Sequence, residues 1–116
     1  MKTERFNEVL DERIKKCLDV LTFKAGEYAT EDRLHNFKVA AELQGCTPMT
    51  ALAGMMAKHT VSVYDLIRDR EQGLVTAPQM WDEKIGDHIN YLLLLNALVQ
   101  EEIDGELKEA TSYESI

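Results

Sequence analysis

The chain has 116 residues, 45% hydrophobic and 29% charged, and 21 acidic against 13 basic side chains give a formal net charge of −8. The length predicts a single helical domain over 1–104 with an acidic C-terminal tail over 105–116, and the composition argues against intrinsic disorder. The charge excludes a general nucleic-acid binder, and the longest apolar run, 91–95, is too short for a bilayer, so we expect a cytoplasmic protein without a signal peptide.

Two helices are expected in the first part of the chain. A stripe of apolar residues at helical spacing predicts a helix over 3–24 that stops at Gly26. Thr30 is a candidate N-cap with two acidic residues directly behind it, which predicts a second helix over 30–44.

Two longer helices are expected after it. Thr47 is an N-cap candidate and Pro48 occupies a first helical position, so we expect a helix over 48–70. A second proline begins the fourth helix, which we expect over 78–104. With short connections and no alternating strand pattern, the fold predicted is all-α, a four-helix bundle-like protomer.

The fourth predicted helix is apolar on nearly every side over 92–99. A helix of that kind is buried all round, and three other helices of one short chain could scarcely surround it. We therefore expect a homo-oligomer, a dimer or tetramer that packs through the third and fourth helices. A core helix of a monomer is the alternative.

A stripe of polar side chains interrupts this apolar helix. Glu83, Asp87 and Asn90 share one face and are followed directly by Tyr91. Two carboxylates one turn apart repel each other, so a divalent cation, or a lysine or arginine from another helix, is expected between them. A solvated helix start is the alternative for Glu83.

Polar residues also stand out on the second and third predicted helices. Lys58 follows a mostly apolar stretch, so its ammonium group either reaches the surface or meets a phosphate or carboxylate. Glu27 and Glu31 are four residues apart near the start of the second helix, and Asn36 falls one turn beyond Asp32. They are candidates for a metal site, and favourable interaction with the helix dipole is the alternative.

The familiar nucleotide and hydrolase motifs are absent from the sequence. It contains no P-loop, no G-x-G-x-x-G and no H-E-x-x-H motif. The histidines, His35, His59 and His88, are isolated and are each expected to be structural or exposed.

Three stretches carry a family resemblance. WDEKIGDHINY at 81–91 resembles the last core helix of the MazG-like, all-α nucleoside triphosphate pyrophosphohydrolases, in particular the small versions of bacteriophages and prophages. The helix that contains Lys58 and His59, and the segments KAGEY at 24–28 and RLHNF at 33–37, are also similar to that family.

The resemblance implies a helical oligomer that binds a nucleotide between helices and, with Mg²⁺, hydrolyses a nucleoside triphosphate to the monophosphate and pyrophosphate. Carried over, Glu83 and Asp87 are the metal ligands, and Glu27 and Glu31 are catalytic. The resemblance and the polar stripes together predict four ligand-binding residues, which are Lys58, Asn36, Asn90 and Tyr91. If the protein is phage-encoded, its compartment is the bacterial host cytoplasm.

The acidic pattern departs from that of active relatives, which carry E-x-x-E on one helix and E-x-x-D on the next. Here Glu27 and Glu31 are four residues apart, as are Glu83 and Asp87, a spacing that still places each pair on one helix face. Two further hypotheses follow. One is a non-catalytic phage protein that sequesters a nucleotide or a cyclic-nucleotide signal, and the other is a structural or regulatory interaction module.

Overall fold

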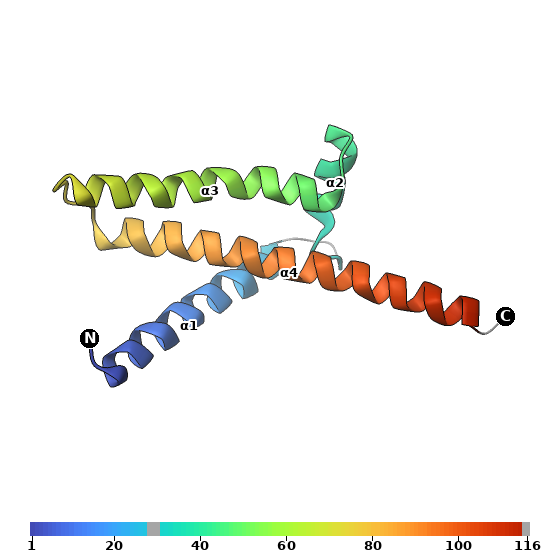
Figure 1. The fold of residues 1–116 in the computed structure, drawn as a ribbon, viewed down its shortest axis with the longest axis horizontal. Helices are drawn as coiled ribbons and strands as arrows, with labels where there is room; N and C mark the ends of the chain where they lie inside the picture. Colours follow the sequence, from blue (N-terminus) through green and yellow to red (C-terminus); the bar gives the residue numbers. More distant parts are fainter. Residues whose placement is uncertain (28–30, 115–116) are drawn as a thin grey trace.

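The structure is a computed structural model that describes the backbone of residues 1–27 and 31–114 and the side chains of 1–23 and 31–111. The described part of the chain is entirely helical apart from its connections, which confirms the all-α prediction (Figure 1). The helices are α1 (Thr3–Glu27), α2 (His35–Gln44), α3 (Pro48–Glu71) and α4 (Pro78–Glu114).

The start of α2 differs from the prediction, and the stop expected at Gly26 is wrong. Helix α1 passes through that glycine. Helix α2 begins five residues later than the expected start at Thr30, a residue outside the described part. The side chain of Asp32 explains the later start, because its Oδ1 accepts a hydrogen bond of 2.9 Å from the backbone N–H of Leu34. This local bond holds the segment before α2 in a turn instead of a helix.

The connection between α2 and α3 follows the sequence signals. Gly45 ends α2 with a φ of 66°, a left-handed conformation that glycine adopts without steric cost. Thr47 then caps α3, and its side-chain oxygen accepts a hydrogen bond of 3.2 Å from the backbone N–H of Thr50. Pro48 occupies the first turn, as predicted.

Helix α4 continues beyond its expected end at residue 104. The segment 105–116 is predicted as a tail, yet it is helical as far as Glu114. A glycine such as Gly105 costs a helix only about 1 kcal/mol relative to alanine, and the residues around it are mostly good helix formers. Gln100 also donates a hydrogen bond of 2.9 Å to Asp104, across one turn.

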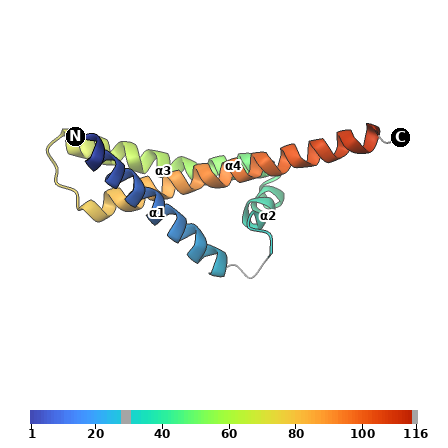
Figure 2. The same ribbon diagram turned by 90° about the horizontal axis from the view of Figure 1, so that it is seen from below.

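Helices α3 and α4 form the centre of the fold. They lie antiparallel and side by side, α2 packs on α3, and α1 crosses α4 at an angle (Figures 1 and 2). Leu34, Phe37, Leu52 and Leu98 form the buried core where α2, α3 and α4 meet. None of the described helices is long and apolar enough to cross a bilayer.

Polar contacts fasten α1 to α4. The guanidinium of Arg13 pairs with Asp82, and Lys16 donates to the same carboxylate at 3.3 Å. These hydrogen bonds lower the pKa of Asp82 below its ordinary value, and the one from Arg13 has the larger effect. One turn further along both helices, the Cys17 thiol faces the Gly86 carbonyl oxygen at 3.9 Å.

The protomer is open for its size. Its radius of gyration is 18.2 Å, where a compact chain of this length has about 13 Å. Its accessible surface of 8806 Å² compares with about 6400 Å² for a compact monomer of the same mass. The C-terminal end of α4 projects beyond the other helices (Figure 1) and accounts for part of this difference.

Candidate functional site

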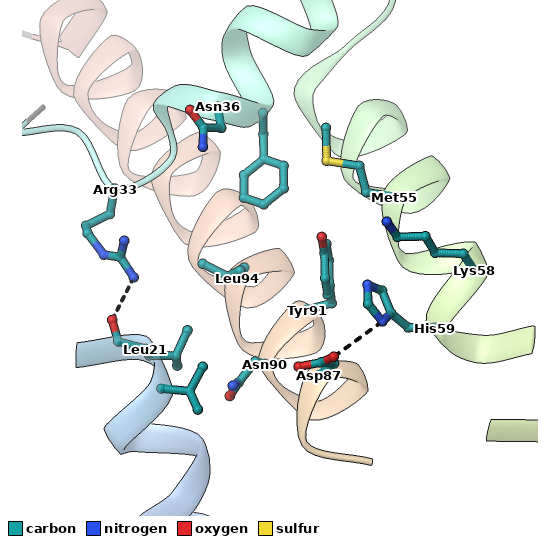
Figure 3. A pocket seen from close by; sticks show the side chains of 12 residues that line it. Leu21, Arg33, Asn36, Met55, Lys58, His59, Asp87, Asn90, Tyr91 and Leu94 are labelled. Atoms are coloured by element: carbon teal, nitrogen blue, oxygen red, sulfur yellow. Dashed lines mark hydrogen bonds and ion pairs between the residues drawn. The ribbon is translucent and has the colours of Figure 1, made fainter. Parts of the chain in front are cut away.

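A cavity of about 380 Å³ lies where the four helices approach one another. One wall is apolar and aromatic, and polar side chains from α2, α3 and α4 converge on it (Figure 3). Its lining residues are Val20, Leu21, Arg33, Asn36, Phe37, Met55, Lys58, His59, Asp87, Asn90, Tyr91 and Leu94.

Helix α4 supplies one wall of the cavity. Its cavity-lining residues follow one another at steps of three, one and three, a spacing that puts all four on one face of a helix. They are Asp87, Asn90, Tyr91 and Leu94. The polar stripe predicted from the sequence therefore faces a cavity and continues into an apolar surface.

Asn90 is the buried polar residue of the described part of the chain, with 6% of its surface exposed. Its side-chain oxygen Oδ1 has no hydrogen-bond partner among the described residues. Because a buried carbonyl oxygen without a donor costs free energy, this atom is suited to accept a hydrogen bond from a ligand or to coordinate a cation.

Tyr91 is held between two rings from different helices. The His59 ring lies 4.7 Å from it, centroid to centroid, at an interplanar angle of 32°. The Phe37 ring meets it edge-on at 6.4 Å and 69°. These contacts position the phenol ring in the cavity, where Figure 3 shows it standing between Leu94 and Lys58.

The imidazole of His59 lies close to a carboxylate. Its Nδ1 is 3.8 Å from Oδ2 of Asp87, and the His59 side chain is 15% exposed. Burial lowers the pKa of His59 below its ordinary value of 6.5, and the nearby Asp87 carboxylate only partly opposes this shift. His59 is therefore neutral near pH 7, and one ring nitrogen is left able to accept a hydrogen bond.

Two cationic side chains border the cavity from opposite sides of Tyr91 (Figure 3). Lys58 reaches inward from α3 and makes no ion pair with a described carboxylate. Arg33 precedes α2, and its Nη2 donates a hydrogen bond of 3.0 Å to the backbone carbonyl of Leu21. Among the described residues that line the cavity, Asp87 is the one acidic residue beside two cations.

A second hollow adjoins the cavity between α1 and α4. Asp87 and Asn90 line both spaces, and Glu83 and Asp19 line only the second. Glu83 is exposed, with its Oε1 3.9 Å from Nζ of Lys84. The two carboxylates of the predicted metal pair thus face the same hollow, and one of them also reaches the main cavity.

The predicted site residues separate into groups. The cavity brings together Asn36, Lys58, Asp87, Asn90 and Tyr91, while Glu83 lines the second hollow. Glu31 lines a third hollow between α1, the segment before α2, and α4. The side chain of Glu27 lies outside the described residues. Within the described part, no three His, Cys, Asp or Glu side chains come together as a metal-binding group.

Sequence reasoning missed two polar residues of the cavity, Arg33 and His59. His59 was expected to be structural or exposed, and it contacts Tyr91 and Asp87 of another helix. Its spacing of four residues from Met55 places both on the cavity face of α3, which is a signal that the sequence carried. No local pattern marks Arg33, which reaches the cavity through the packing of α2.

Comparisons with protein-family models, curated proteins and solved structures find no match for this chain. The chemistry of the cavity itself is therefore the guide to function. An apolar and aromatic wall, two amides, a neutral imidazole and two cations suit a ligand that carries both a flat ring and negative charge.

Proposed function

We propose that this protein binds a nucleotide in the cavity between its four helices. The lining of the cavity supports this proposal, because one part of it is suited to a base and another part to phosphate. The resemblance of the α3 and α4 sequences to MazG-like nucleotide pyrophosphohydrolases points to the same ligand class.

The base is expected against the apolar and aromatic wall. Phe37, Tyr91 and Leu94 offer surfaces on which a flat heterocycle packs. Asn36 and Asn90 carry amide groups that both donate and accept, as the edge of a base requires. A cavity of about 380 Å³ is within the range of roughly 300–1,000 Å³ common for small-molecule sites.

The phosphates are expected at Lys58. Its ammonium group is directed into the cavity and lacks a carboxylate partner among the described residues (Figure 3). Arg33, on the other side, adds a second positive charge. Charged hydrogen bonds of this kind contribute about 1.5–3 kcal/mol each, which corresponds to roughly a 10- to 150-fold effect on affinity.

The buried side-chain oxygen of Asn90 is the single observation that carries the proposal. A carbonyl oxygen that is buried without a donor among the described residues costs about 1–3 kcal/mol. Asn90 lies on the wall shared by the cavity and the second hollow, next to both spaces. A ligand amino group or a bound cation would recover this cost.

Mg²⁺-dependent hydrolysis of a nucleoside triphosphate is the second candidate, and one observation favours it. Glu83 and Asp87 face the same hollow as the unpaired Asn90 oxygen. This donor set fits Mg²⁺, which is commonly held by one or two carboxylates together with substrate phosphates and water. When bound, the metal would neutralise phosphate charge and activate a water molecule.

Binding without chemistry is nevertheless the better supported function. Hydrolysis also needs a group that orients or deprotonates water, and the residue predicted for this role within the described part, Glu31, lines a different hollow. The proposal is therefore nucleotide binding, with sequestration of a nucleotide or cyclic-nucleotide signal as its non-catalytic form.

Titration calorimetry with a panel of nucleoside mono-, di- and triphosphates and cyclic nucleotides tests the proposal. We expect saturable binding of at least one nucleotide, with an affinity about tenfold or more lower in Lys58→Met. The matched control is Lys15→Met on α1, a residue that lines none of the three hollows, and it should bind as the wild type does. No binding across the panel, or equal losses in both variants, would refute the proposal.

The two forms of the function differ in their metal dependence and products. For simple binding, the ligand is recovered unchanged and EDTA has no effect on affinity. For hydrolysis, pyrophosphate is released only with Mg²⁺, and Asp87→Asn abolishes the release while leaving the fold intact.

A further inference from the structure

The face of α4 opposite the core carries an apolar stripe that no described residue covers fully. Its residues recur in alternating steps of four and three, which is the spacing of a coiled-coil seam. The stripe consists of Ile85, Ile89, Leu92, Asn96, Val99 and Ile103, and it is called the α4 seam below.

The other faces of α4 are already occupied within the protomer. His88 and Tyr91 contact α3, through Thr60 and His59 respectively. Asp82 contacts α1 on another side of the helix. The α4 seam lies on the remaining side, so a helix could approach it without displacing α1 or α3.

Several seam residues are strongly exposed. Leu92 is 48% exposed, Val99 37% and Ile103 41%. Large aliphatic side chains at seam spacing are normally buried against a partner helix, because complete burial stabilises each by about 1.5–3 kcal/mol. Leaving several of them exposed along one helix face is therefore unfavourable.

The apolar surface continues from the α4 seam onto α1. Leu93, beside the seam, and Leu18 of α1 line the same hollow. From Leu18 a row of exposed side chains runs back along α1 at intervals of four residues, through Ile14 and Leu10 to Phe6, which are 44–56% exposed. The uncovered surface therefore spans two helices.

We propose that a second copy of this chain packs along the α4 seam, with the two α4 helices parallel and in register. The protomer exposes roughly 2400 Å² more surface than a compact monomer of its mass. A stable interface needs only about 800 Å² from each partner, so a second copy has sufficient surface to bury.

Asn96 fixes the orientation. It is the polar residue within an otherwise aliphatic seam, and only a parallel, in-register pair places it opposite Asn96 of the partner subunit, where the two amides can hydrogen-bond. A single asparagine at such a position specifies register at a cost in affinity. In an antiparallel pair it would face an aliphatic residue and stay unsatisfied.

The acidic end of α4 gives the pair a characteristic salt dependence. In a parallel pair, Glu106 and Glu109 of the two copies come near one another beyond Ile103, the last seam isoleucine. Repulsion between exposed like charges is screened by salt. The affinity of the pair should therefore rise, instead of falling, as ionic strength increases.

Sedimentation equilibrium with a matched pair of variants tests the interface. Val99→Asp places a carboxylate in the α4 seam and should weaken association at least 100-fold. Val61→Asp makes the same change at a 57% exposed position of α3 and should leave association unchanged. Helix content by circular dichroism verifies that both variants fold. A monomeric wild type, or dissociation by Val61→Asp alone, would overturn the proposal.

Two further variants test orientation without loss of folding. In a Cys46→Ser background, mild oxidation of Leu92→Cys should yield a covalent dimer, whereas Glu101→Cys, outside the seam, should not. Asn96→Leu should tighten association at least tenfold and broaden the mixture of oligomers. A failure of Leu92→Cys to cross-link in a sample that sediments as a dimer would overturn the parallel register.

Discussion

Replacing Asn90 with leucine should stabilise the protein while it removes ligand binding. The side chain is 6% exposed, and its Oδ1 lacks a donor among the described residues. Natural cores rarely keep such a group, and we attribute its presence at this position to the proposed ligand binding. Asn90→Leu removes the unpaired group and keeps a side chain that branches at the same carbon.

The magnitude follows from the burial of that one atom. An unsatisfied buried carbonyl costs about 1–3 kcal/mol, and a change of side-chain shape costs less than about 1.5 kcal/mol when space is available. Asn90 adjoins two hollows, which can accept the larger leucine. We therefore expect the free energy of unfolding to rise by about 1 kcal/mol, equivalent to an increase in Tm of about 4–8 °C.

Thermal and urea unfolding measure the first effect, and calorimetric titration with nucleotide measures the second. Asn7→Leu, the same change at an exposed position of α1, is the control and should alter stability by less than about 0.5 kcal/mol. A destabilised Asn90→Leu protein, or one that keeps wild-type affinity for the nucleotide, would refute the reasoning.

Three further predictions concern pH and the helix ends. The pKa of His59 is lowered in the folded state, so the unfolded state binds more protons between that pKa and 6.5. The free energy of unfolding should therefore fall as the pH decreases through this window. Urea unfolding at a series of pH values should show a flatter pH profile for His59→Gln. Thr47→Ala removes the cap that accepts from the Thr50 N–H and should destabilise the fold by about 1 kcal/mol in thermal unfolding, with Thr47→Ser close to wild type. Gly45→Ala forces a side chain into a left-handed conformation and should lower the free energy of unfolding, measured in urea, by about 1–2 kcal/mol. Gly54→Ala within α3, where no neighbour obstructs the new Cβ, should instead stabilise the fold. Equal effects of the two substitutions would contradict this explanation.

The fold was predictable where the sequence contains strong local signals. Thr47 with Pro48 marks the start of α3 because both residues act within one turn. The start of α2 was not predictable from Thr30 alone, because the Asp32 side chain competes for the backbone of the same turn. The extent of α4 was underestimated because the acidic segment 105–116 was interpreted as a tail, although a glycine such as Gly105 has only a small cost in a helix.

The candidate site was predictable along single helices but not between them. Asp87, Asn90 and Tyr91 could be grouped because helical spacing alone puts them on one face. The approach of His59 and Arg33 depends on how α2 and α3 pack against α4, which periodicity does not encode. A helical wheel thus identifies one wall of a cavity, and tertiary packing supplies the others.

The most direct measurement of nucleotide binding in this cavity is nuclear magnetic resonance of the side-chain amide groups during titration with a nucleotide. We expect saturable shifts for Asn90 and Asn36, which line the cavity, and none for Asn7 on the exposed part of α1. Unchanged Asn90 and Asn36 resonances at millimolar concentrations of every nucleotide in the panel would contradict this expectation.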